Sequence, residues 1–131
     1  MKIAVDTNLL VRAAVRDHPG QTEMAMKEMG RAELLALALP CLCEFAWVLR
    51  SVYGFRPPEI GKAIRTAIAA GNVETNRPAV EAGLALLDAG GDFADGVIAH
   101  EGQWLGAEMF VSFDAEAVKM LKAHGVAARA L

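Results

Sequence analysis

The sequence predicts an α/β domain built on a short, mostly parallel sheet, and three observations support this. Short apolar runs alternate with longer segments of helical periodicity along the whole chain. The 131 residues are 54% hydrophobic and 22% charged, which suffices for a buried core without disulfides or metal. No linker, repeat or low-complexity tract interrupts the chain. We therefore expect one domain over residues 1–131.

In the first half, polar residues and prolines separate the predicted elements. Asp6 stops an apolar run, and Pro19 ends the next helix because proline disfavours helix in the residue before it. Pro40 suits the first turn of a helix that is apolar nearly all round and is therefore expected to be buried. The elements expected here are a strand at 3–5, helices at 9–16 and 21–35, a strand at 37–39 and a helix at 41–53.

In the second half, glycines end helices and prolines begin them. Gly54 and Gly71 follow helical segments, and Pro57 and Pro78 stand where new helices start. The last two helices are each preceded by an aspartate that can cap the first turn. The elements expected here are a helix at 57–70, a strand at 73–74, helices at 78–89 and 93–105, a strand at 108–111, a helix at 115–123 and a strand at 126–131.

Composition excludes several classes of protein. Thirteen Lys and Arg against sixteen Asp and Glu give a formal charge of −3, which argues against a wholesale basic nucleic-acid clamp but leaves a local basic patch open. Two cysteines cannot make a disulfide framework or a four-ligand zinc site. No signal peptide, membrane-length apolar run, nucleophile motif or phosphate-binding glycine loop is recognisable. These features predict a soluble cytoplasmic domain with no membrane partner.

Acidic residues stand where an α/β sheet places its ligands. Asp6 and Asp114 follow predicted strands, and ligand sites of parallel sheets lie beyond the carboxyl ends of the strands. Helix capping is the alternative role for both. Asp92 and Asp95 are three residues apart and share a helix face. A solvated helix face is the alternative there.

Glu44 is the only charged residue between Pro40 and Leu49. A carboxylate in such apolar surroundings needs a partner, because burying it alone costs several kcal/mol. Either a salt bridge to a distant arginine or a cation in a pocket would supply one.

Several carboxylates at one sheet edge need a compensating charge. Two carboxylates 4 Å apart repel by ~4 kcal/mol at an effective dielectric constant of 20. Ligation by oxygen alone, without Cys or His, favours Mg²⁺ or Mn²⁺ over zinc. Such carboxylate clusters mostly serve phosphate chemistry. Arg12 and Arg16, one helical turn apart, are candidates to hold a phosphate backbone, with an ordinary solvated face as the alternative.

Four segments together resemble the PIN-domain nucleases, and their spacing is similar to that of VapC-type toxin ribonucleases. They are Asp6-Thr7-Asn8, the lone Glu44, the run from Asp92 to Ala99, and Ser112-Phe113-Asp114. The resemblance covers the whole chain. It implies that Asp6, Glu44, Asp95 and Asp114 are the metal-binding acids, with Asp6, Asp95 and Asp114 holding the metal and Glu44 close by. Asp92 is then auxiliary, and Thr7, Asn8 and Ser112 are polar support positions. Gly96 departs from the family's small helix former and is expected to loosen its helix.

The same resemblance implies a fold and a function. It implies a three-layer α/β/α domain with strand order 3-2-1-4-5 and a Mg²⁺-dependent endoribonuclease that acts as a toxin and is silenced by an antitoxin. A catalytically silent PIN-like binding module and a metal-dependent small-molecule phosphatase are the alternatives. The first half also carries more apolar residues than one small core covers, so the helices up to Tyr53 and the turn at 54–58 are expected to form a homodimer face and an antitoxin groove. The apolar residues in question are Met24, Met26, Met29, Leu34, Leu35 and Trp47.

Overall fold

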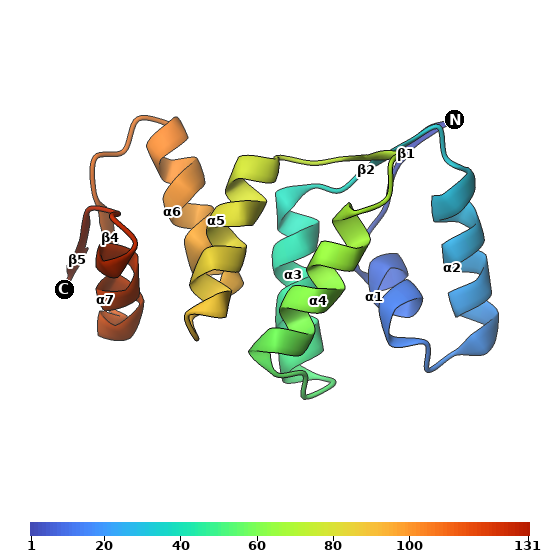
Figure 1. Ribbon diagram of the computed structural model, residues 1–131, viewed down its shortest axis with the longest axis horizontal. Helices are drawn as coiled ribbons and strands as arrows, with labels where there is room; N and C mark the ends of the chain where they lie inside the picture. The colour runs from blue at the N-terminus through green and yellow to red at the C-terminus, as the bar shows by residue number, and fades with distance from the viewer. The chain divides into compact units, whose positions relative to one another are not determined.

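A computed structural model describes residues 1–131, and the chain divides into two compact units, Met1–Asn76 and Arg77–Leu131. Both units combine helices with short parallel strands, which confirms the predicted α/β class. In Figure 1 the first unit runs from blue to green and the second continues to red. No helix of either unit is both long enough and apolar enough to span a membrane. The single domain over residues 1–131 stays a prediction.

The first unit contains a three-stranded parallel sheet in the order β1-β2-β3. Ile3 lies opposite Leu35 in the first pair of strands, and Leu35 lies opposite Val73 in the second. This order agrees with the 3-2-1 part of the predicted sheet. The elements of the unit are β1 (Lys2–Ala4), α1 (Thr7–Val15), α2 (Pro19–Arg31), β2 (Leu34–Ala36), α3 (Leu39–Ser51), α4 (Pro57–Ile68) and β3 (Val73–Glu74).

The second unit contains a two-stranded parallel sheet and three helices. Phe110 pairs with Ala128 and Ser112 with Ala130, so the pairing of the fourth strand with the fifth is as predicted. The predicted order also places the first strand beside the fourth, and this pairing stays a prediction. The elements of the unit are α5 (Arg77–Asp88), α6 (Phe93–Trp104), β4 (Phe110–Ser112), α7 (Ala115–Ala123) and β5 (Ala128–Ala130). A hydrophobic cluster in the core of this unit consists of the buried residues Leu86, Ala99, Val118, Leu121 and Ala128.

Glycines allow α5 and α6 to approach each other closely. A Cβ added to Gly96 would lie 2.5 Å from the backbone oxygen of Ala82, and one added to Gly83 would lie 2.7 Å from the ring of Phe93. Neither distance is possible for a real side chain without moving its neighbours. The expectation that Gly96 loosens its helix is therefore wrong, because the missing side chain is what lets the two helices pack.

The second strand is displaced from its predicted position. It covers Leu34–Ala36 instead of 37–39, and α2 ends at Arg31 instead of continuing to residue 35. Residues 34–39 are all apolar, so neither a periodicity nor a glycine or proline marks where the helix stops. Pairing continues one step beyond the strand, since the Leu37 amide donates to the Glu74 carbonyl at 2.9 Å.

The helix α3 is buried on one face only, which corrects the prediction of a helix buried all round. Cys41, Leu42, Phe45, Ala46 and Leu49 are buried, whereas Glu44 and Arg50 are exposed and Trp47 is 64% exposed. Pro40 does stand in the first turn, as predicted. The apolar composition of this helix therefore includes a tryptophan that faces outward rather than into the core.

Candidate functional site

Three aspartates of the second unit lie close together, and the charges of two of them change the pKa of the third. Burial raises the pKa of Asp95, and the negative charges of Asp92 and Asp114 raise it further. Asp92 and Asp95 come from the first turn of α6, and Asp114 immediately precedes α7. These three carboxylates are among the predicted site residues, and their common role in binding a metal stays a prediction.

Asp114 is held in place by local hydrogen bonds. Its side chain accepts a hydrogen bond from the Ala117 amide at 3.1 Å, which caps α7. Its own amide donates to the Ser112 hydroxyl oxygen at 3.0 Å. Ser112 thus helps to fix the backbone of Asp114, and the supporting role that the family resemblance implies for it stays a prediction. Asp92 occupies the N-cap position of α6 but makes no capping hydrogen bond with its side chain, so its carboxylate is not committed to capping that helix.

A second acidic group surrounds Cys41 in the first unit. Burial raises the pKa of the Cys41 thiol, a hydrogen bond with Thr7 lowers it, and the negative charges of Asp6 and Glu44 raise it. Asp6 also caps α1 by accepting a hydrogen bond from the Leu9 amide at 2.9 Å. Asp6, Thr7 and Glu44 therefore gather around one thiol, although they come from the start of α1 and from α3.

Glu44 lies in different surroundings from those predicted. Its side chain is exposed, and it takes part in none of the ion pairs Arg12–Asp17, Arg31–Glu28 and Arg56–Glu59. The argument that a buried carboxylate must be paired is therefore wrong for this residue, because α3 turns Glu44 toward the exposed face. Its carboxylate is accessible to a ligand or a cation.

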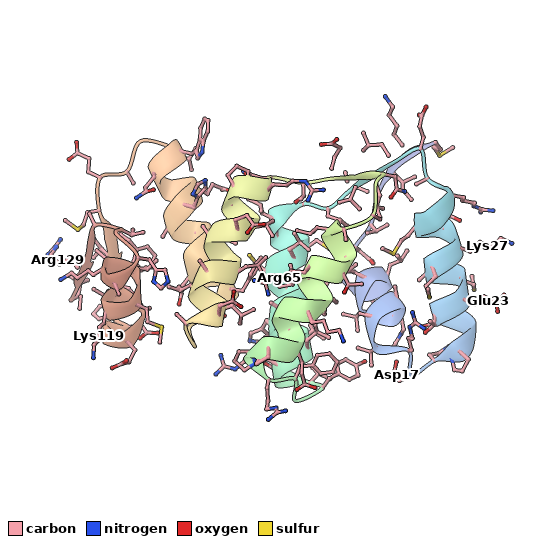
Figure 2. All side chains as sticks on the ribbon, viewed as in Figure 1. Asp17, Glu23, Lys27, Arg65, Lys119 and Arg129 are labelled. Atoms are coloured by element: carbon pink, nitrogen blue, oxygen red, sulfur yellow. The ribbon has the colours of Figure 1, made fainter.

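The two arginine candidates differ in how their side chains are engaged. The Arg12 guanidinium donates to Asp17 at 3.2 Å and to the Tyr53 hydroxyl at 3.4 Å. The Tyr53 hydroxyl in turn donates to the other Asp17 oxygen at 3.3 Å. Asp17 is labelled in Figure 2, in the turn that joins α1 to α2. Arg16 is exposed and ends α1 in a left-handed conformation with φ of 61°.

The donor set of the predicted acids fits a hard divalent cation. All the predicted ligands are carboxylates, and the pKa of Asp95 is raised by burial first and then by the negative charges of Asp92 and Asp114, which a bound cation would offset. Asp6 and Glu44 belong to the first unit, and Asp92, Asp95 and Asp114 belong to the second. No group of three or more His, Cys, Asp or Glu side chains is arranged so that it could hold a metal ion.

An apolar groove of about 510 Å³ lies on the first unit and includes part of the predicted interaction surface together with residues of α4 outside it. It is lined mainly by α1, α2 and α4, with Arg16, Glu59 and Lys62 as its charged residues. Met26 and Met29 line it, and Met24 stands outside it at 71% exposed. Leu35, by contrast, is fully buried in the sheet. In Figure 2, Glu23 and Lys27 point away from α1 on the outer side of α2.

Sequence reasoning missed the side chains that surround the candidate residues. Tyr53 and Asp17 hold Arg12, yet Tyr53 is 41 residues from it and no local pattern links the two. Cys41 entered the sequence argument only as one of two cysteines, too few for a disulfide framework or a four-ligand zinc site. Its spacing of three residues from Glu44 on the same helix was the available signal, because such residues share a helix face.

No protein-family model matches this chain. No curated protein matches it either.

Proposed function

We propose that this chain is a Mg²⁺-dependent endoribonuclease of the PIN-domain type that acts as the toxin of a type II toxin–antitoxin system. The observation that carries the proposal is the trio of Asp92, Asp95 and Asp114, in which the like charges and partial burial raise the pKa of Asp95. A partly buried carboxylate beside two like charges is a candidate for binding a cation. The resemblance of the four acidic segments to PIN-domain nucleases supplies the reaction class.

In this proposal Asp6, Asp95 and Asp114 hold the cation, Asp92 assists, and Glu44 lies nearby. Mg²⁺ held there would lower the pKa of a water molecule and would neutralise charge on the scissile phosphate. Glu44, which is exposed and belongs to none of the described ion pairs, would orient that water and accept its proton. Ser112 keeps Asp114 in position through the hydrogen bond to its amide. The resemblance to PIN-domain nucleases assigns Thr7 and Asn8 to the support of Asp6.

RNA binding is proposed to rely on Arg16 more than on Arg12. Arg12 is already engaged by Asp17 and Tyr53, so moving it onto a phosphate would break an ion pair. Arg16 is exposed at the end of α1 and takes part in no ion pair. A single arginine fits a phosphate well because its guanidinium donates two parallel hydrogen bonds.

The proposed partners are a cognate antitoxin and a second copy of the chain. The apolar groove lined by α1, α2 and α4 suits the apolar face of an antitoxin helix. An antitoxin arginine that enters the acidic site would compete with Mg²⁺ for Asp6, Asp95 and Asp114, so inhibition should weaken as the Mg²⁺ concentration rises. The cytoplasm, where RNA and antitoxin both occur, is the proposed location.

One set of reactions distinguishes the proposal from its two alternatives. The purified chain is incubated with a panel of structured and unstructured RNAs, and separately with a small phosphate monoester, each in Mg²⁺ and in EDTA. The nuclease predicts RNA fragments in Mg²⁺, none in EDTA and no inorganic phosphate from the monoester. Phosphate release without RNA cleavage would favour the phosphatase. A folded chain that leaves both substrates intact would favour the binding module.

A further inference from the structure

The second unit contains a cavity of about 250 Å³ that the proposed nuclease site does not use. Its lining residues come from α5, α6, α7 and the segment after α7, and most of them are small or apolar, such as Ala82 and Leu86. Three polar side chains also line it: His100, Gln103 and His124. Two of the three histidines of the chain therefore face one small cavity.

One of these histidines has an unsatisfied ring nitrogen. The Nε2 atom of His100 is buried and has no hydrogen-bond partner. Buried polar atoms are nearly always paired, and leaving one unpaired costs roughly 1–3 kcal/mol. Because His100 is one of the residues that line the cavity, its unpaired nitrogen points to a ligand there.

The other histidine, His124, has a lone pair on Nε2 that can bind a metal ion. His124 Nδ1 lies 2.8 Å from the Met120 carbonyl oxygen, and a carbonyl can only accept, so Nδ1 carries the hydrogen. In the neutral ring Nε2 is then left with its lone pair. Anchoring one ring nitrogen on a backbone carbonyl is how proteins commonly orient histidines that bind metals.

We propose that His100 and His124 bind a divalent transition-metal ion in this cavity through their Nε2 atoms, with Zn²⁺ as the representative ion. Imidazole nitrogen is a preferred ligand of Zn²⁺, Ni²⁺ and Cu²⁺, whereas Mg²⁺ prefers oxygen. The amide oxygen of Gln103 lines the same cavity, and it and water complete the coordination. The site is separate from the carboxylates of the proposed nuclease and takes a different class of ion.

Calorimetric titration of the untagged full chain with Zn²⁺, in excess Mg²⁺ to occupy the carboxylates, tests the proposal. We expect the wild-type chain to bind one equivalent. His100→Ala and His124→Ala should each weaken binding at least tenfold. His18→Asn is the matched control, because His18 caps α2 in the first unit through Nδ1 and asparagine can also cap. This control should bind Zn²⁺ as the wild type does.

Imidazole ¹⁵N spectra of the wild-type chain give a second readout that needs no substitution. Zn²⁺ should shift the Nε2 signals of His100 and His124 and leave those of His18 unchanged. The proposal is overturned if no Zn²⁺ binds, if binding survives in both alanine variants, or if Zn²⁺ binds without moving the two Nε2 signals. His124 is exposed, so its alanine variant should fold even if that of His100 does not.

Discussion

Asp95 is partly buried and has two like-charged neighbours, and we expect this to lower the stability of the folded chain by a measurable amount. Its pKa is raised by burial first and then by Asp92 and Asp114. The folded chain therefore holds the proton of Asp95 more tightly than the unfolded chain does. Below the ordinary aspartate pKa of about 3.9, Asp95 does not lower the free energy of unfolding. This stability is lost as the pH rises through the raised pKa, because the carboxyl then becomes charged in the folded chain.

Asp95→Asn should therefore stabilise the chain at pH 7 in EDTA, because it removes a partly buried charge from two negative neighbours. The increase in melting temperature should shrink toward zero at pH 3, where the wild-type carboxyl is protonated. Asp92→Asn serves as the comparison and should give a smaller increase, since Asp92 is exposed. A lower melting temperature for Asp95→Asn at pH 7 would show that the carboxylate is stabilised rather than strained.

Glu44→Gln tests the role assigned to an exposed carboxylate. Because Glu44 has no ion-pair partner, the free energy of unfolding should change by no more than about 0.5 kcal/mol. The rate of RNA cleavage should fall by about 10²–10⁴-fold, the usual contribution of a general base. Denaturation midpoints and cleavage rates are measured on the same preparation. Full activity in this variant would remove Glu44 from the mechanism.

Asp6 and Asp114 each cap a helix, so substitutions must separate capping from catalysis. Asparagine caps about as well as aspartate, whereas alanine costs about 0.5–2 kcal/mol at this position. Asp6→Asn and Asp114→Asn should therefore keep the stability of the wild type and lose RNA cleavage. Asp6→Ala and Asp114→Ala should lose both. Urea denaturation with parallel cleavage assays checks this. Active asparagine variants would reduce both residues to helix caps.

At the scale of elements, the close packing of α5 on α6 depends on glycine. Gly96→Ala should destabilise the chain by about 1–3 kcal/mol, because its Cβ would meet backbone atoms of Ala82 that cannot move aside cheaply. Gly102→Ala on the same helix is the matched control. Its Cβ would meet only the Ala107 side chain at 3.9 Å, so we expect a neutral or stabilising change of up to about 1 kcal/mol. Equal effects at both positions would contradict the packing argument.

The sequence predicted elements well where a local signal exists. Proline at a first helical turn and aspartate at a cap have local physical causes, and the start of α7 at Ala115 was predicted to the residue. The strand at Leu34–Ala36 was misplaced because a uniformly apolar run has no periodicity. The exposed face of α3 was missed for a related reason, since the outward-facing Trp47 resembles a core residue in composition alone.

At the scale of the whole molecule, the sequence allows residues to be grouped when strand ends or helix spacing position them. It does not reveal residues that come together only through the packing of helices. Asp92, Asp95 and Asp114 could be grouped because strand ends and helix spacing position them. His100 and His124 could not be grouped, because they lie on α6 and just after α7 and only the packing of these helices makes them line one cavity.

The central claim is the proposal that the predicted acids bind Mg²⁺, and metal-dependent melting tests it most directly. A ligand that binds only the folded state raises stability by mass action. We expect Mg²⁺ to raise the melting temperature of the wild-type chain in a concentration-dependent way. Asp6→Asn and Asp95→Asn should each abolish that rise while remaining folded in EDTA. A wild-type chain that does not respond to Mg²⁺, or a rise that persists in either variant, would contradict the account.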